Sequence, residues 1–270
     1  MAFTSGKDRM RWEELSVPEI DALDRENAVL LLPLGSVEQH GRHLPVGTDT
    51  MLATTLAVAA AERFAGPAVV LPPPWYGLSL HHMRFPGTIT LTVSTMVALV
   101  EDIVASLVAH GFRRIVLVNG HGGNIGVVDV LASTLGHRYY GRARIAGLTY
   151  FQLAGEAIAG LRVSARGGMG HACEFETAMM QHVHPGLVAM ARAETTYPNT
   201  GTEYVGTDLL GGSRVRTYND FGDLSPSGTL GDPSLASPEA GARFHDAVTG
   251  ELVKFLEDFA RWKIPAPAKG

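Results

Sequence analysis

Two apolar segments that lack polar and apolar alternation constrain the fold of this chain more than any other feature. They are residues 27–34 (NAVLLLPL) and residues 114–118 (RIVLV). A strand with this pattern is buried on both faces, which is typical of a parallel sheet covered by helices on each side. The two segments therefore predict an α/β fold with a mostly parallel central sheet.

Along the rest of the chain, predicted strands alternate with predicted helices, as such a sheet requires. Further strands are predicted at residues 67–71 and 144–149, and helices at residues 49–64, 94–110, 124–135, 172–183 and 237–262. Ser94 is predicted as an N-cap, Gly111 as a C-terminal stop, and Ser237-Pro238 as the start of the last helix. Strands that alternate with helices indicate βαβ units. No linker interrupts the pattern, so residues 1–270 are predicted to form a single domain.

Acidic and imidazole side chains gather where two of the predicted strands end. Glu38, His40 and Asp49 follow the first strand, and His121 follows the strand at residues 114–118. Ligands of open α/β sheets bind beyond the carboxyl ends of the strands, so these side chains are expected to meet in space. Carboxylate oxygen and imidazole nitrogen bind Zn²⁺, Mn²⁺ and Fe²⁺. The pattern predicts a divalent-metal site and metal-assisted hydrolysis.

A third cluster, His171, Glu174 and Glu176, lies at the start of a predicted helix. His171 and Glu174 are one helical turn apart and share a face. Glutamates at a helix N-terminus also interact favourably with the helix dipole, which accounts for one of the two without any chemistry.

Other interpretations of these clusters stay open from the residues alone. Asp49 is also suited to capping the helix that follows it. The glycine-rich turn around His121 resembles a dinucleotide-binding turn, but its third glycine is displaced by one place. No acidic residue that could hold a ribose ends the next strand, at Thr149. His81 and His82 are compatible with an ordinary surface turn, and Cys173 with a small buried residue.

Composition narrows the class of protein. The net charge is −5, which gives no electrostatic footprint for nucleic acid. The single cysteine excludes an intrachain disulfide and fits a cytoplasmic location. The N-terminus lacks the apolar core of a signal peptide, and no apolar run is long enough for a transmembrane helix. Residues 195–235 are rich in Gly, Thr, Ser, Asp and Pro, and so long an irregular segment is expected to cover a site or an interface.

At the same clusters, the chain resembles the creatininase family of metal-dependent amidohydrolases. The matching pieces are residues 33–49 (PLGSVEQHGRHLPVGTD), 85–88 (FPGT), 119–124 (NGHGGN) and 171–177 (HACEFET). The resemblance implies a three-layer α/β/α sandwich, a site for two divalent ions (Zn, Mn or Fe) and a homohexamer. It implies that Glu38, Asp49 and His121 hold one ion, and that His40, Asp49 and a further glutamate hold the other.

The position of that further glutamate departs from creatininase itself. There it lies two residues after the histidine that corresponds to His121, and in this chain the place is Gly123. Glu176 is the first choice for the last ligand and Glu174 the second. Trp12, Trp75 and Trp262 are the only tryptophans, and none lies between His121 and Glu176, so creatinine is not the favoured substrate.

The expected activity is hydrolysis of a C–N amide bond, in a cyclic amide or formamide, by water activated between two metal ions. His171 and Glu174 are the catalytic candidates, with His171 carrying a proton to the departing nitrogen. Substrate-binding candidates are Ser79, His82, Gly122, Gly123 and Asn124, with backbone N–H groups at residues 122–124 stabilising the oxyanion.

The alternatives to amide hydrolysis are hydrolysis of a peptide or ring C–C bond, or a metal-containing binding subunit without turnover. A small-molecule substrate and a homo-oligomer are expected, without nucleic acid or membrane partners.

Overall fold

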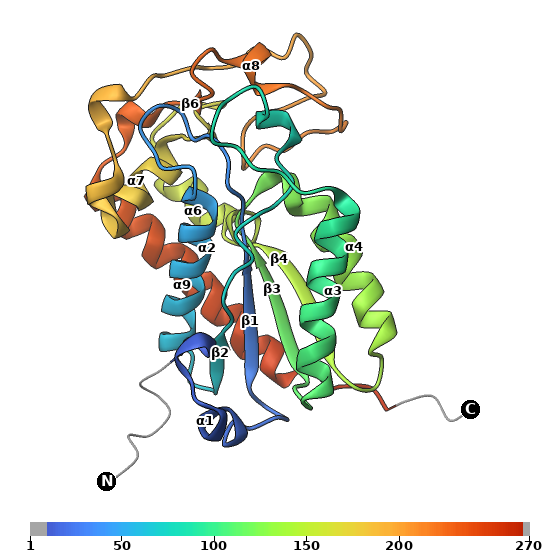
Figure 1. Cartoon of the computed structure of the whole chain (residues 1–270). Helices are drawn as coiled ribbons and strands as arrows, with labels where there is room; N and C mark the ends of the chain where they lie inside the picture. Colours follow the sequence, from blue (N-terminus) through green and yellow to red (C-terminus); the bar gives the residue numbers. More distant parts are fainter. Residues whose placement is uncertain (1–9, 267–270) are drawn as a thin grey trace.

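A computed structural model describes residues 10–266 and contains a central sheet of four parallel strands. The strand order is β2-β1-β3-β4 (Figure 1), formed by Ala68–Val70, Val29–Leu34, Arg114–Asn119 and Arg144–Thr149. All six residues of β1 and of β3 are buried. The strands predicted from apolar runs without alternation are therefore confirmed as central and covered on both faces.

Helices cover both faces of the sheet and complete a three-layer α/β/α sandwich (Figure 1). Val29 and Leu31 of β1 face one core, and Leu30 and Leu32 face the other, as the alternation of side chains along a strand requires. The first core is closed by α2 (Thr48–Arg63), α7 (Glu174–Val183) and α9 (Pro238–Arg261), and the second by α3 (Val93–Ala109) and α4 (Ile125–Arg138).

Shorter elements connect and cover this framework. They include α1 (Val17–Asp21), α5 (Tyr150–Leu153), α6 (Gly155–Leu161), α8 (Phe221–Leu224), and an antiparallel pair, β5 (Met169–His171) with β6 (Leu230–Gly231). Short 3-10 turns occupy Trp12–Glu14, Leu80–His82, Gly122–Asn124, Pro185–Leu187, Met190–Arg192 and Pro233–Leu235.

All five predicted helices are present, but α4 ends at Arg138 and not at residue 135, α7 begins at Glu174 and not at residue 172, and the N-cap of α3 also differs. Thr92, not Ser94, is the N-cap: its backbone is extended and its hydroxyl accepts a hydrogen bond from the Thr95 N–H at 3.2 Å. Ser94 lies inside the first turn. Gly111 ends the helix with φ of +88°, and the Ser237 hydroxyl caps α9 by accepting the Ala240 N–H at 3.1 Å.

The strand register places three loops at one edge of the sheet. Leu34 pairs with Asn119, and Asn119 pairs with Thr149, so β1, β3 and β4 end at the same level. The chain that follows each strand therefore enters the same region, which is the geometric basis of the site. Among residues 10–266, no helix is both long enough and apolar enough to cross a lipid bilayer.

Candidate metal centre

The loop after β1 turns Glu38 and His40 inward. The Glu38 N–H donates to the Val46 carbonyl at 2.9 Å, and the Leu44 N–H donates to the His40 carbonyl at 3.3 Å, which closes the loop on itself. Gly41 takes φ of +62° within it, a backbone conformation that favours glycine. The loop then delivers Asp49 to the first turn of α2.

Asp49 lies between two imidazoles that come from different parts of the chain. Its Oδ1 is 3.0 Å from His40 Nε2, and its Oδ2 is 2.9 Å from His121 Nδ1. His121 Nε2 is 3.2 Å from Glu38 Oε2. The expected convergence of the clusters after β1 and β3 is therefore observed, although the sequence separates them widely.

The two glutamates at the start of α7 occupy different environments. Glu176 reaches the cluster, with Oε1 4.0 Å from His40 Nε2. Glu174 points away from it and accepts the backbone N–H groups of Val163 at 2.9 Å and Ser164 at 2.8 Å. The structure thus brings Glu176 to the predicted metal position. It does not bring Glu174 to the site as either ligand or catalyst, because both of its oxygens hold the loop after α6.

A strained residue helps to position Glu176. Ala172 has φ of +50°, and it is the only residue other than glycine with positive φ in the described part of the chain. Its N–H donates to Glu176 Oε2 at 2.6 Å. Strain of this kind costs on the order of 1 kcal/mol and is retained where surrounding contacts over-determine the geometry, which is common at functional sites.

Gly123 has no room for a side chain. A Cβ there would lie 2.2 Å from the Leu78 carbonyl oxygen and 2.4 Å from His121 Nε2. A glutamate at this position would need the backbone to move. Glu176 approaches the imidazole cluster from α7 instead.

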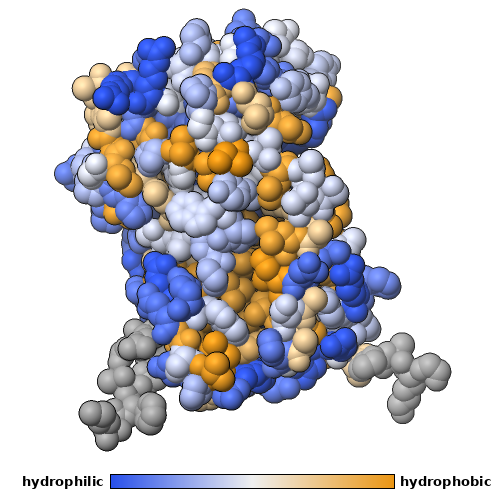
Figure 2. Space-filling model, in the orientation of Figure 1, coloured by the Kyte–Doolittle hydropathy of each residue, from blue (hydrophilic) through white to orange (hydrophobic). Residues whose placement is uncertain are grey.

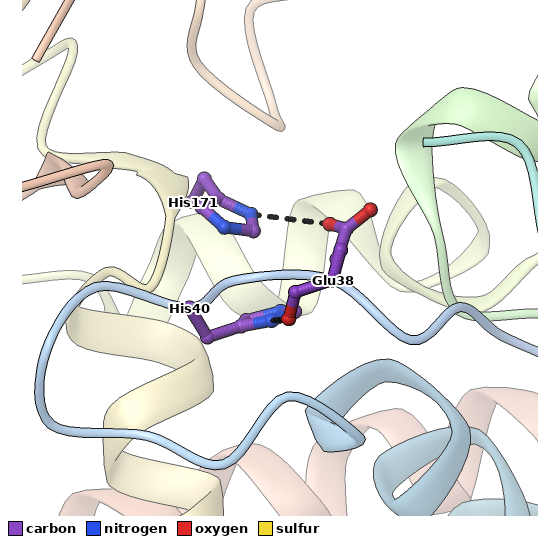
Figure 3. Close-up of side chains that lie close together, drawn as sticks. All are labelled: Glu38, His40 and His171. Carbon is purple, nitrogen blue, oxygen red and sulfur yellow. Dashed lines mark hydrogen bonds and ion pairs between the residues drawn. The ribbon is translucent and has the colours of Figure 1, made fainter. Parts of the chain in front are cut away.

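Figure 3 shows His171 beside His40 and Glu38, with a dashed line for its ion pair with Glu38. The Nε2 of His171 is 2.6 Å from the Gln39 carbonyl oxygen, which fixes this nitrogen as the hydrogen-bond donor. Its Nδ1 is 3.6 Å from Glu38 Oε1, and its ring lies 4.2 Å from that of His40. Burial lowers the pKa of His171 well below its ordinary value, and the His40 imidazole adds to the effect. A neutral His171 therefore presents Nδ1 as an acceptor to the site.

His81 also belongs to the candidate centre, although its sequence context is equally compatible with a surface turn. It groups with Glu38 and His121 as a set of donor atoms that could hold one ion. Burial lowers its pKa to about 3, and the neighbouring His121 contributes to the lowering. The signal that could have identified it is the adjacent pair His81-His82 in a loop that follows a parallel strand.

His82 is fully buried beside the cluster. Its Nδ1 pairs with the Gln39 side-chain amide at 2.8 Å, and its Nε2 is 3.3 Å from Glu38 Oε1. Phe221 covers it, with ring centroids 4.2 Å apart. Burial lowers the pKa of His82 below its ordinary value.

Two predicted substrate-binding residues have structural partners. Ser79 donates to Glu38 Oε2 at 2.5 Å and also contacts Ser36, so it orients the Glu38 carboxylate. Asn124 donates to the Gly35 carbonyl at 2.9 Å and accepts from the Leu78 N–H at 3.0 Å. Both side chains are buried, and neither lines the cavity. The structure places them behind the site, where they join its loops.

The electrostatics of the cluster favour a positive charge on two of its imidazoles, His40 and His121. Burial opposes protonation of His40, but the Asp49 carboxylate outweighs it and raises the pKa of His40 to about 9. His121 behaves alike: burial opposes the charge, while Glu38 and Asp49 hold its pKa well above the ordinary value. Burial and the nearby Asp49 carboxylate raise the pKa of Glu176 to about 7, against the opposing effect of His40.

The residues present fit a divalent metal. Glu38 Oε1 and Asp49 Oδ2 are buried. Histidine nitrogens lie at ion-pair distance from both oxygens, but neither oxygen accepts a hydrogen bond of normal geometry among residues 10–266. Within the same residues, the ion pairs of Glu38, Asp49 and Glu176 are all made with histidines, without lysine or arginine. Three sets of donor atoms lie close enough to hold an ion: Glu38 with His40 and His171, Glu38 with His81 and His121, and His40 with Asp49 and Glu176.

The cluster opens into a cavity of about 320 Å³. Its buried end is lined by Glu38, Asp49, His121 and Glu176, and Gly122 and Gly123 lie along its wall. Its outer end is formed by residues 205–221. The prediction that the irregular segment 195–235 covers a site agrees with this placement.

Comparisons with known proteins agree on one family. Residues 13–256 match the creatininase family, described as creatinine amidohydrolase. A mycofactocin precursor peptide peptidase of Mycolicibacterium smegmatis is 34% identical over 240 residues, covering 87% of this chain and 85% of the relative. Creatinine amidohydrolase of Pseudomonas putida is 30% identical over 252 residues, covering 88% and 91%. A 3-dehydro-scyllo-inosose hydrolase of Thermotoga maritima is 24% identical over 273 residues, covering 94% and 86%.

Solved structures extend the similarity to three dimensions. A crystal structure of creatinine amidohydrolase superposes with a TM-score of 0.79 at 28% identity, covering 94% of this chain and 99% of that one. A manganese form of creatininase gives 0.77 at 28% identity, with 93% and 98% covered. A creatininase mutant of Zn–Zn type superposes with a TM-score of 0.77 at 27% identity, with the same shares of the two chains covered. With the profile match, the relatives and the fold in agreement, this chain belongs to the creatininase family of hydrolases.

Proposed function

We propose that the protein hydrolyses a C–N amide bond of a small molecule, a cyclic amide or a formamide, at a centre of two divalent ions. The observation that carries the proposal is Asp49, whose two oxygens face His40 and His121 at 3.0 and 2.9 Å. A carboxylate with both oxygens directed at separate donor groups is suited to bridging two cations. The relatives of this protein include a creatinine amidohydrolase, and solved structures of relatives carry manganese or zinc.

Two overlapping ligand sets would hold the ions. Glu38, His121 and one oxygen of Asp49 would bind the first. His40, Glu176 and the other oxygen of Asp49 would bind the second, and these three already form one candidate group. Binding requires His40 to lose the proton that its pKa of about 9 retains at neutral pH.

When bound, the two ions would lower the pKa of a shared water and polarise the substrate carbonyl. His171 would accept a proton at Nδ1 and pass it to the departing nitrogen, because its Nε2 is held by the Gln39 carbonyl. Gly122 and Gly123 line the cavity, and their backbone N–H groups would stabilise the developing oxyanion. Phe221 and His82 would exclude water from one side.

A chelator is expected to abolish hydrolysis, and added Mn²⁺ or Zn²⁺ to restore it. The measurement is the rate on a panel of cyclic amides and formamides with metal-free and metal-loaded protein, alongside metal content. A rate that survives complete metal removal contradicts the proposal. Full metal loading without turnover of any amide favours a binding subunit without activity.

Hydrolysis of a peptide bond is the second candidate. It is favoured by the similarity to mycofactocin precursor peptide peptidases and by an outer cavity rim that carries no tryptophan among its lining residues. The same metal centre would serve both reactions. Short peptides therefore belong in the panel beside the cyclic amides.

We also propose that the protein assembles with copies of itself, in a hexamer, in the cytoplasm. The support is a concentration of exposed apolar side chains between residues 75 and 93: Trp75, Tyr76, Leu80, Met83, Ile89 and Val93. Figure 2 shows apolar surface on the face that carries α3. Large exposed apolar patches mark interaction surfaces. The buried free thiol of Cys173 fits a reducing compartment.

Light scattering after size-exclusion chromatography is expected to give about six times the mass of the 28.8 kDa chain. Trp75→Glu combined with Val93→Glu is expected to reduce that mass, because two charges would enter the apolar surface. Val163→Glu, at a residue 67% exposed outside this segment, is the matched control. A monomer in the wild type contradicts the assembly.

A further inference from the structure

The outer end of the cavity carries an arginine without an acidic partner in the described part of the chain. Arg216 lines the cavity and takes part in no ion pair among residues 10–266. Arg214, two positions earlier, is paired with Glu203 at 3.0 Å. Arg84, also near this rim, is paired with Asp220 and Asp223. Of these three arginines, only Arg216 both lines the cavity and has no acidic partner among residues 10–266.

Neutral donors lie beside Arg216. Thr217 and Asn219 line the same cavity, and neither side chain forms a hydrogen bond within the described residues. The segment is held over the metal centre at its far end. There Phe221 packs on His82 and the Asp220 carboxylate accepts the Gly222 N–H at 2.8 Å.

The charges of the cavity are therefore divided. The buried end holds three carboxylates and the imidazoles. At the outer end, the Asp208 carboxylate is paired with Arg162, so Arg216 is the unpaired charge there, beside two neutral donors. A planar guanidinium binds a carboxylate through two parallel hydrogen bonds. One positive charge with neutral donors matches a group of a single negative charge better than a doubly charged phosphate.

We propose that Arg216 binds a free carboxylate of the substrate, so that the enzyme selects amides that carry a carboxylate away from the bond to be cleaved. N-acyl amino acids, carboxylate-bearing cyclic amides and the C-terminal end of a short peptide share this chemistry. This specificity rests on the proposed function, since it assumes that the scissile carbonyl lies at the metal centre.

The test uses matched pairs of substrates on manganese-loaded protein. Each N-formyl amino acid, cyclic amide and acetylated dipeptide is supplied as the free acid and as its primary amide. The ratio of kcat/KM for acid over amide is expected to be about 10 in the wild type and to fall to about 1 in Arg216→Gln, by loss of a charge-assisted bond. Arg214→Gln, which removes the same charge from the same loop outside the cavity, is expected to keep the ratio.

A binding measurement keeps the specificity separate from the activity. If no substrate is turned over, the proposed function fails, and calorimetry with N-acetylglycylglycine and its amide still tests Arg216. Tighter binding of the acid, weakened about 10-fold in Arg216→Gln but not in Arg214→Gln, supports the assignment. Equal binding of acid and amide overturns it. Inorganic phosphate that binds more tightly than the acid, and only with Arg216 present, overturns the choice of carboxylate.

Discussion

Asp49→Asn is expected to lower kcat/KM by about 1,000-fold or more, which corresponds to roughly 4 kcal/mol of transition-state stabilisation. Asparagine keeps the shape of the side chain but has one acceptor oxygen and no charge. The two imidazoles now face two carboxylate oxygens at 3.0 and 2.9 Å. One substitution therefore removes a ligand from both proposed ions.

Metal content per chain, measured by mass spectrometry of the elements, is expected to fall with the rate. Circular dichroism is expected to show an unchanged fold, because asparagine fills the same volume. Asp129→Asn, at an exposed position on α4, is the matched control and is expected to leave both quantities unchanged. An Asp49→Asn protein with full metal content and a rate within about threefold of the wild type would falsify the bridging role, because such a loss is below 1 kcal/mol.

Substitution of the two α7 glutamates is expected to separate metal binding from stability. Glu176→Gln is expected to lose metal and about 1,000-fold in kcat/KM, since it removes the carboxylate that approaches His40. Glu174→Gln is expected to keep the metal and to lose about 1–3 kcal/mol of stability. Its amide would place an NH₂ group against one of two backbone donors.

Thermal unfolding of the metal-free proteins gives the clearest contrast. Burial raises the pKa of Glu176 to about 7, so folding binds a proton that the unfolded chain releases above its ordinary value of 4.5. At pH 8, above both pKa values, ionisation of Glu176 in the folded state lowers the stability of the metal-free protein. At pH 4, below both values, the carboxyl is protonated in both states and this cost is absent. Glu176→Gln removes it, so the Tm of the metal-free variant is expected to match or exceed that of the wild type at pH 8. The Tm of Glu174→Gln is expected to fall by several degrees. The reverse pattern would exchange the two assignments.

The central strands and main helices were predictable because their signals are local. Unalternated apolar runs gave β1 and β3, and Ser237-Pro238 gave the start of α9. The cap of α3 was misplaced by two residues. Thr92 and Ser94 are both good caps, and only the extended backbone at Thr92 decides between them.

The candidate metal cluster was partly predictable for a topological reason. Parallel strands that end at one edge bring Glu38 and His121 together, and the sequence shows both strands. The choice between Glu174 and Glu176 was not predictable, since both begin the same helix. It depends on the left-handed backbone at Ala172 and on the loop amides that occupy Glu174.

The sequence by itself determined the layered α/β framework, the family resemblance and the ends of the strands at which the ligands gather. Only the tertiary structure decided that His81 joins the cluster, that Ser79 and Asn124 lie behind it, and that Arg216 lines the cavity. The physical reason is the distance along the chain over which each interaction acts. Hydrophobic periodicity and helix caps act within a few residues, whereas the orientation of a loop side chain depends on contacts with segments far along the chain.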